Sequence, residues 1–356
     1  MRYPVSFLRK SLRLLLLSSL LVLVNTACQS SRLQPSARYG AAMGWDAKGN
    51  QMILFGGRAK GLFGERVLKD TWIFNLEDRT WRKFATDSNP PPRLAPGLVF
   101  DPDSNQLILF GGLGDNQRFG DTWILDLENG SWEEISPPVS PSPRSDMGMA
   151  LDVDQRKALL FGGYCQEFER EKCSETWIFD LESRTWIEID TEDSPPITYG
   201  LRLVFEPGSQ RFLQWGGHMA GIKDNVFQSL GYADQLWSFS FTEGNWITSP
   251  YQAAATPRAR YWHHLVSDPT TAEIILYGGD GGQGFLDDTW IYDSQSNQWR
   301  LVQTSNAPPP RIIGATAFDE NLGQLILFGG VGEDFYVYQD TWIYSVTLST
   351  WEQIFP

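Results

Sequence analysis

Four side chains have the chemistry of a small-molecule site: Asp146, Arg202, Trp262 and His264. Arginine can hold a carboxylate, histidine and aspartate can exchange protons, and an indole offers a flat apolar face. Arg202 would hold the anion, while His264 and Asp146 would supply the acid and the base. A structural ion pair, of Arg202 with Glu206 or Asp146, lining a water-filled channel is the alternative. The residues alone leave both interpretations open.

Other catalytic patterns are missing from the sequence. The three histidines are His218, His263 and His264, and no HExxH, Walker loop, GxSxG or metal-spaced Cys/His cluster occurs. One acidic turn at Asp280 is weak support for a calcium site. We therefore expect no cofactor and no metal. The sequence favours a protein that is not an enzyme, without deciding the question.

Arginine recurs at one position of a repeating pattern, eight residues before an acidic residue. The column consists of Arg38, Arg93, Arg144, Arg260 and Arg311, with Thr198 in the sixth place. A ring of arginines near a channel mouth would bind anions, so all five are candidate binding residues. Their recurrence favours the alternative, in which they form structural hydrogen bonds to neighbouring backbone.

A sixfold repeat must position these side chains. In each copy an acid is followed ten residues later by a glycine pair, then by a Trp, and by a second Trp nine residues after the first. Short apolar runs such as 52–55 and 325–328, bounded by turn residues, predict strands rather than helices. We expect four strands per copy, of which the first runs from the Arg column to the acid. A period of about 50 residues with four strands is typical of a propeller blade.

The glycine pairs and paired tryptophans resemble the kelch family, the propeller type also found in the central domain of galactose oxidase. The resemblance covers residues 35–356 and implies an all-β, six-bladed propeller with four antiparallel strands per blade. Its tryptophans are expected to lie in the core. The fourth blade, with Thr198 and Gln235-Leu236, is the divergent copy. The expected blades span about 35–85, 90–136, 141–190, 195–248, 257–302 and 308–355.

The resemblance to galactose oxidase does not extend to its chemistry. A copper oxidase of that kind needs two separated histidines, two tyrosines and a cross-linked cysteine. His263 and His264 are adjacent on an expected strand and would point to opposite faces. We therefore exclude copper oxidase activity.

Residues 1–27 have the features of an export signal. Basic residues between Arg2 and Arg13 precede an apolar stretch, 14–24, that is short for a membrane span. The segment ending in Cys28 resembles the bacterial lipobox, in which the Cys is lipidated, although Asn25 departs from the usual aliphatic residue. We expect a signal peptide at 1–27, lipidation at Cys28, a linker at 28–34, and anchoring to the bacterial cell envelope (the outer membrane in a diderm). Cleavage near Ala27, giving a periplasmic or secreted protein, is the alternative.

The loops that follow the glycine pairs are a second candidate surface. Cys165 and Cys173 would close one loop as a disulfide in an oxidising compartment, and two free thiols are the alternative. Tyr164 precedes that loop, and His218 begins the longest one, 218–233. Tyr164 and His218 are therefore candidate binding residues. A basic loop in the first copy and an aromatic loop in the sixth add to this surface.

The net charge of −14 excludes nucleic acid as a partner, since the surface would repel phosphate. We predict a monomeric, non-catalytic binding module whose partner is a cell-surface or periplasmic protein, or a glycan. Membrane contact is expected only through the N-terminal lipid. The alternative is a small-sugar enzyme, because some exported bacterial kelch propellers that this chain resembles interconvert sialic acid anomers. Such an enzyme needs a concave pocket on the order of a few hundred Å³ with convergent polar groups.

Overall fold

A computed structural model describes residues 33–61, 64–165, 173–223, 226–249 and 255–355. The expected signal peptide 1–27, Cys28 and most of the expected linker 28–34 lie outside these residues. Residues 35–356 form one compact unit. The helical residues of the described part are short 3₁₀ segments, at 173–174 and in η2 (Glu333–Phe335), and its regular structure is otherwise β. The described part holds no helix that is long and apolar enough to cross a membrane.

Six four-stranded antiparallel sheets make up this unit, each formed by one copy of the sequence repeat. The first two are β1 (Ala42–Asp46), β2 (Gln51–Phe55), β5 (Thr71–Asn75), β6 (Thr80–Phe84); and β7 (Gly97–Asp101), β8 (Gln106–Leu113), β9 (Arg118–Asp126), β10 (Ser131–Ile135). The third and fourth are β12 (Gly148–Asp152), β13 (Lys157–Phe161), β15 (Thr176–Asp180), β16 (Thr185–Ile189); and β18 (Arg202–Glu206), β19 (Arg211–Trp215), β22 (Leu236–Ser240), β23 (Asn245–Ser249). The last two are β24 (His264–Asp268), β25 (Glu273–Asp280), β26 (Phe285–Asp293), β27 (Gln298–Val302); and β28 (Ala315–Asp319), β29 (Gln324–Phe328), β30 (Thr341–Ser345), β31 (Thr350–Phe355).

Short additional strands form where the loops after three of the glycine pairs pair with themselves or with residues at the Arg-column positions. They are β3 (Arg58–Gly61) with β4 (Gly64–Val67); β11 (Arg144–Ser145) with β14 (Tyr164–Cys165); and β17 (Thr198–Tyr199) with β20 (His218–Lys223) and β21 (Val226–Tyr232). We call the surface built by these strands and the neighbouring loops the rim.

The first strand of each sheet begins later than the sequence predicts. We expected it to run from the Arg column to the acid, but β1 begins at Ala42, four residues after Arg38. Two residues after the Arg column the backbone adopts a positive φ in every repeat, for example 58° at Asp146 and 47° at Ile313. This left-handed residue interrupts the extended chain. The alternation of side chains therefore does not carry across it.

The sheets are joined by one recurring aromatic contact. The closing Trp of each repeat lies against the aromatic residue that precedes the glycine pair of the repeat before it, with ring centroids 4.8 to 5.5 Å apart. The pairs are Phe55–Trp132, Phe110–Trp186, Phe161–Trp246, Trp215–Trp299, Tyr277–Trp351 and Phe328–Trp81. All six closing tryptophans are buried, as the sequence predicts.

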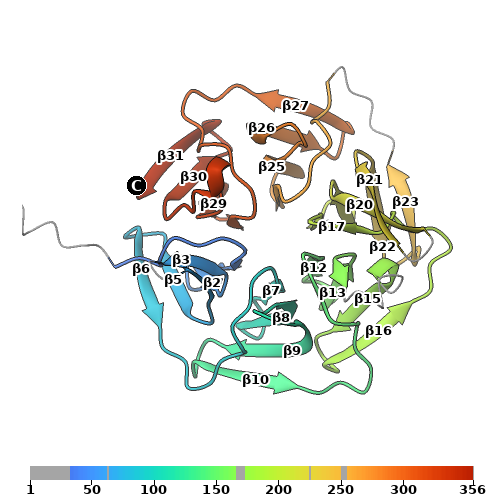
Figure 1. Ribbon diagram of the computed structural model, residues 1–356, viewed down its shortest axis with the longest axis horizontal. Coiled ribbons are helices and arrows are strands. Elements are labelled where there is room, and N and C mark those ends of the chain that lie inside the picture. Colours follow the sequence, from blue (N-terminus) through green and yellow to red (C-terminus); the bar gives the residue numbers. More distant parts are fainter. Residues whose placement is uncertain (1–32, 62–63, 166–172, 224–225, 250–254, 356) are drawn as a thin grey trace, which may run out of the picture. The chain divides into compact units, whose positions relative to one another are not determined.

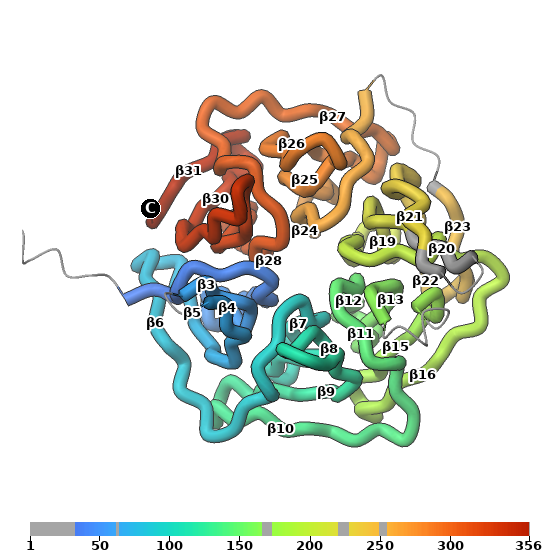
Figure 2. The backbone as a smooth tube through the Cα atoms, viewed as in Figure 1, coloured from blue at the N-terminus to red at the C-terminus, as the bar shows by residue number. Residues whose placement is uncertain are grey.

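In Figure 1 the sheets of residues 35–356 follow one another around a centre in chain order. Figure 2 shows the inner strands β7, β12, β24 and β28 nearest that centre. The last sheet meets the first: Trp81 packs against Phe328 and donates its indole N–H to the Thr341 hydroxyl at 3.0 Å. The left-handed residues also form a ring of hydrogen bonds in which each N–H donates to the carbonyl of the preceding repeat. It runs through Ala95, Asp146, Gly200, Trp262 and Ile313 and returns with Gly40 donating to Ile313.

Candidate functional site

All five arginines of the recurring column are buried and paired. Arg311 donates to the Gly329 carbonyl at 2.9 Å and, through both Nη atoms, to the Asp340 carboxylate at 2.7 and 2.8 Å. The Trp342 indole N–H donates to the same carboxylate at 2.7 Å. The other arginines have equivalent partners two residues before the first Trp of their repeat. These are Asp70, Asp121, Glu175 and Asp288.

These contacts favour the structural interpretation of the column over the anion-binding ring. No arginine of the column is more than 1% exposed. A guanidinium that forms a bidentate pair with a carboxylate is already neutralised and geometrically satisfied. The five residues therefore hold the rim to the sheets.

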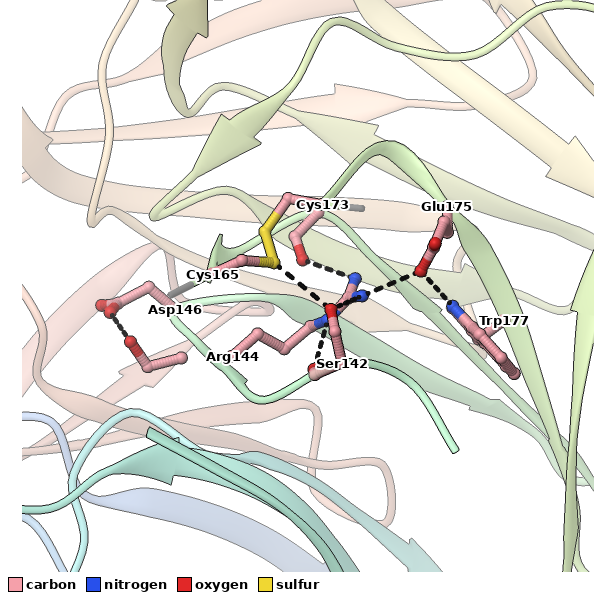
Figure 3. The surroundings of a disulfide bond; sticks show 9 residues. Ser142, Arg144, Asp146, Cys165, Cys173, Glu175 and Trp177 are labelled. Atoms are coloured by element: carbon pink, nitrogen blue, oxygen red, sulfur yellow. Dashed lines mark hydrogen bonds and ion pairs between the residues drawn. A yellow bond between two sulfur atoms is a disulfide. The ribbon is translucent and has the colours of Figure 1, made fainter. Parts of the chain in front are cut away.

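The third repeat varies this arrangement, as Figure 3 shows. Arg144 donates to Glu175 at 3.2 Å and to the Ser142 hydroxyl at 2.8 Å, and that hydroxyl lies 3.6 Å from the Cys165 sulfur. Cys165 is joined to Cys173 in a disulfide, with the Cα atoms 6.0 Å apart. Burial lowers the pKa of Arg144 to about 10, against the raising effect of Glu175. The disulfide thus fixes the start of this rim loop, of which residues 166–172 lie outside the described part.

Asp146 and Trp262 meet, as the sequence suggests. The Trp262 indole N–H donates to Asp146 Oδ1 at 3.0 Å, and the Ser145 hydroxyl donates to Oδ2 at 2.8 Å. Both residues belong to the ring of left-handed positions, with φ of 58° and 54°. Burial raises the pKa of Asp146, opposed by these hydrogen bonds and by the charge of Arg202.

His264 does not join this pair as an acid or base. Its Nδ1 lies 3.1 Å from the Tyr277 carbonyl, and its Nε2 accepts the Gly314 N–H at 2.9 Å. Burial, with a further contribution from Arg202, lowers the pKa of His264 to about 3. Both ring nitrogens are occupied by backbone, so the predicted set of Arg202, Asp146 and His264 is not a catalytic constellation.

A cluster of half-buried aromatic side chains covers the rim of the third to fifth repeats. We call the following residues the rim cluster: Tyr164, Tyr199, His218, Tyr232, Tyr261 and Trp262. Tyr232 and Tyr261 stack with centroids 5.2 Å apart and planes 12° apart. Tyr261 and Trp262 lie 4.4 Å apart, and Arg118 lies 4.2 Å above the ring of Tyr164. Side chains of this type are enriched at protein interfaces.

His218 lies at the middle of the rim cluster. Its Nδ1 hydrogen-bonds with the Tyr199 hydroxyl, and its Nε2 lies 2.7 Å from the Ser229 hydroxyl. A serine bound to a histidine is the arrangement that activates nucleophiles, but the third group must stabilise an imidazolium. Here it is a phenol, and burial raises the pKa of Tyr199 to about 12, so it stays neutral. The hydrogen bonds of His218 therefore suit a structural role, orienting the hairpin of β20 and β21, better than the activation of Ser229 as a nucleophile.

Two cavities lie among the inner strands. One, of about 160 Å³, is bordered by the left-handed ring and the first residues of the inner strands, and Arg202 and Asp146 line it. We call it the channel cavity. The other, of about 300 Å³, is bordered by later residues of the same strands and is mostly apolar, with Trp45, Phe100, Phe205 and Phe318 in its wall. The channel cavity is smaller than the pockets of roughly 300–1,000 Å³ that hold ordinary small-molecule ligands.

The other predicted loops are only partly available for contacts. Arg58, in the basic loop of the first repeat, lies 3.7 Å from Glu65. In the sixth repeat Phe335 and Tyr336 are exposed, whereas Tyr338 stacks on Arg311 with the guanidinium 3.9 Å from the ring centroid. Tyr338 thus covers a structural arginine.

Sequence reasoning found three members of the rim cluster, Tyr164, His218 and Trp262, and missed Tyr199, Tyr232 and Tyr261. A signal for two of these was present. Tyr199 and Tyr261 each follow the Arg-column position, in adjacent repeats, where the third repeat has Ser145. Tyr232 had none, because the pairing of β20 with β21, which sets it opposite His218, contains an irregularity after Met219.

Comparison with known proteins supports the repeat. A family model described as the KLHDC2/KLHL20/DRC7 Kelch-repeats domain matches residues 19–217 and 202–356. Adagio protein 3 of Arabidopsis thaliana is 28% identical over 301 residues, which cover 81% of this chain and 47% of that protein. Kelch domain-containing protein 2 of Bos taurus is 25% identical over 322 residues, 82% of this chain and 75% of that protein. The chain spans about half the length of the plant relatives that it matches.

Proposed function

Since the chain belongs to the kelch-repeat family, we propose that it is a non-catalytic protein-binding module whose partner docks on the rim cluster. Kelch domains generally mediate protein interactions. The rim cluster carries the proposal. Six half-exposed aromatic side chains gather on the loops of three repeats, and the repeat itself requires none of them. Rigid aromatic side chains provide much contact area for little loss of conformational entropy.

The small-sugar enzyme is less well supported. His264 is held by backbone on both ring nitrogens, and the channel cavity of about 160 Å³ has little room for a sugar. The larger cavity, of about 300 Å³, is lined mainly by apolar side chains. A site for sugar chemistry needs several convergent polar groups.

The proposed scaffold is a closed six-bladed propeller in which each four-stranded sheet is one blade. The aromatic contacts recur six times, including the one between the first and last repeats. The backbone ring of hydrogen bonds returns from Ile313 to Gly40. These features support closure by packing of the first blade against the sixth, with blades at the boundaries given above.

We also propose that a monomeric chain is exported and anchored through Cys28, so that its partner is a protein of the cell envelope. The basic and apolar character of residues 1–27 supports this location. The Cys165–Cys173 disulfide supports it further, since disulfides persist in oxidising compartments. Labelling with a radioactive fatty acid tests the anchor: Cys28→Ser should abolish labelling. Equal labelling of both chains would contradict it.

The rim is tested by cross-linking the purified full chain to envelope proteins, followed by titration of any captured candidate as a purified protein. Tyr232→Ala and Tyr261→Ala should weaken that binding by about tenfold or more, as expected of aromatic residues at the centre of an interface. Arg300→Ala, on an outer strand, is the matched surface control. Unchanged affinity in both rim variants would contradict the proposal, as would binding to a glycan array without a protein partner.

A further inference from the structure

The channel cavity has one charged group that the fold does not neutralise. Apart from Asp146, Arg202 and Thr316, its wall consists of glycine, alanine, proline, methionine, leucine and isoleucine residues. Arg202 is the first residue of β18; His264 holds the equivalent position in the fifth repeat, and the remaining equivalent positions hold small residues. Those are Ala42, Gly97, Gly148 and Ala315. Arg202 therefore extends into space that neighbouring strands leave open.

The contacts of Arg202 differ from those of the five column arginines. Its Nη1 donates to the Leu201 carbonyl at 2.9 Å, which is a neutral acceptor. Among the described residues, no Asp or Glu oxygen lies within 4.0 Å of its guanidinium nitrogens, so Arg202 forms no ion pair with them. A cation without a partner in a confined space is costly, because it loses hydration without gaining an opposite charge.

Asp146 compensates this charge only in part. Its two oxygens already accept the Trp262 indole N–H and the Ser145 hydroxyl. Burial raises its pKa, which disfavours the charged form that Arg202 needs. Burial, and after it the charge of Arg202, lower the pKa values of His263 and His264, so both rings stay neutral and neither offsets the charge of Arg202. The cavity therefore favours an anion that pairs with Arg202.

We propose that the channel cavity binds a small organic carboxylate, with the carboxylate on the Arg202 guanidinium and a short apolar body against Met147, Met149 and Leu265. A planar guanidinium fits a carboxylate through two parallel hydrogen bonds. A cavity of 150 Å³ accommodates benzene, so about 160 Å³ has room for about six heavy atoms. None of the rim-cluster residues lines this cavity, although Trp262 of the cluster binds Asp146, which does.

The proposal is tested with butyrate and the full chain, at constant ionic strength. Saturation-transfer NMR and the thermal unfolding midpoint should both report saturable binding of butyrate. Butyramide has the same shape without the charge and should bind at least about tenfold more weakly, because it loses the charge-assisted hydrogen bonds to the guanidinium. Chloride has the charge without the body and should also bind at least about tenfold more weakly, because it loses the apolar contacts and the two parallel hydrogen bonds. Equal responses to butyrate and chloride would overturn the carboxylate assignment in favour of a general anion site.

Variants identify the group that binds. Arg202→Met keeps an unbranched, flexible side chain but removes the charge and the guanidinium donors, and it should weaken butyrate binding by about tenfold or more. Arg202→Lys keeps the charge but loses the two parallel donors of the guanidinium fork, and it should give an intermediate affinity. Arg300→Met is the control, because Arg300 lies exposed on the outer strand β27 and pairs with Glu273. Undiminished binding in Arg202→Met, or no binding by the unaltered chain, would overturn the proposal. If Arg202→Met does not fold, the Lys variant alone decides, and unchanged affinity in it would count against the fork.

Discussion

The fourth repeat and the sixth repeat use different residues to bind the first carbonyl of their glycine pairs. In the sixth, Arg311 connects the glycine-pair carbonyl to Asp340, which in turn binds Trp342. In the fourth, Thr198 and Gln235 stand where the arginine and the aspartate would be. There Gln214 donates to the Gly216 carbonyl at 2.8 Å, which replaces one contact of the missing arginine and leaves out the ion pair.

This difference shows where the chain has room for function. In the sixth repeat a rim residue has a structural role, since Tyr338 covers Arg311. The fourth repeat lacks that ion pair and presents Tyr199, His218 and Ser229 on its rim, and Arg202 in the channel cavity. The repeat that departs most from its siblings thus supplies residues to both proposed sites.

Removing the arginine of the sixth repeat should give the largest effect. Arg311→Met leaves the nearly buried Asp340 without its cation, and breaking such a pair costs about 3–5 kcal/mol in the free energy of unfolding. Urea denaturation measures this cost. The double variant Arg311→Met/Asp340→Leu should recover part of it, since no unpaired charge remains.

The matched control is the exposed pair of Arg79 with Glu352, for which Arg79→Met should cost less than about 1 kcal/mol. Similar costs for Arg79→Met and Arg311→Met would show that the column is not the structural element inferred here.

The fifth repeat contributes a pH dependence, because His263 is buried and its two ring nitrogens have no hydrogen-bond partner among the described atoms. Burial, then the charges of Arg202 and Arg260, hold the pKa of His263 well below its usual value. An unfolded His takes up a proton below about pH 6.5, whereas the folded one does not. The free energy of unfolding should therefore fall as the pH falls through this range, by about 1.4 kcal/mol per pH unit for this residue.

The variant His263→Leu isolates that contribution. It should match the parent within about 1 kcal/mol at pH 8, where the histidine is neutral in both states, and exceed it by about 2 kcal/mol at pH 5. Denaturant titrations at the two pH values measure both numbers. Parallel stability curves for parent and variant between pH 8 and pH 5 would contradict the assignment of a neutral buried His263.

A smaller effect is expected from the Thr that follows the paired acid. The Trp81 indole N–H donates to Thr341 at 3.0 Å, and Thr341→Val would leave that N–H buried without a partner, at a cost of about 1–3 kcal/mol. In the fourth repeat Leu236 takes the place of this Thr, and Trp299 Nε1 has no partner among the described atoms. Trp81→Phe should therefore destabilise the chain more than Trp299→Phe, as thermal unfolding would measure. The reverse order would contradict the role of the hydrogen bond.

The scaffold was predictable because each of its contacts recurs at fixed spacing. The glycine pairs, the closing tryptophans and the acids appear in every repeat, and the structure places them in equivalent positions. The sequence also contained the acidic partners of the five arginines, two residues before the first Trp of their repeats, but their role was not recognised. The loop between each arginine and its acid varies in length, so the spacing did not pair the two columns.

The site was predictable only where a residue departed from its column. Arg202 and His264 were found because small residues occupy the other equivalent positions. The expected role of His264 as an acid or base was not predictable in this way. Both of its ring nitrogens bind backbone groups, at Tyr277 and Gly314, and the alternation of side chains along a strand does not indicate such contacts. The left-handed residue before each first strand also broke the assumed alternation.

The smallest effect on stability should come from a substitution on the rim of the fourth repeat. It contrasts most clearly with the effect of removing Arg311 in the sixth repeat. Tyr199→Phe removes the hydroxyl that binds His218 but keeps the ring contacts with Tyr164 and Tyr261. Both partners are half-exposed, so water can replace the lost bond, and the free energy of unfolding should change by less than about 1 kcal/mol. Urea denaturation alongside Arg311→Met gives the comparison. A loss as large as that of Arg311→Met would mean that the rim cluster holds the fold together, and the separation of scaffold from binding surface would fail.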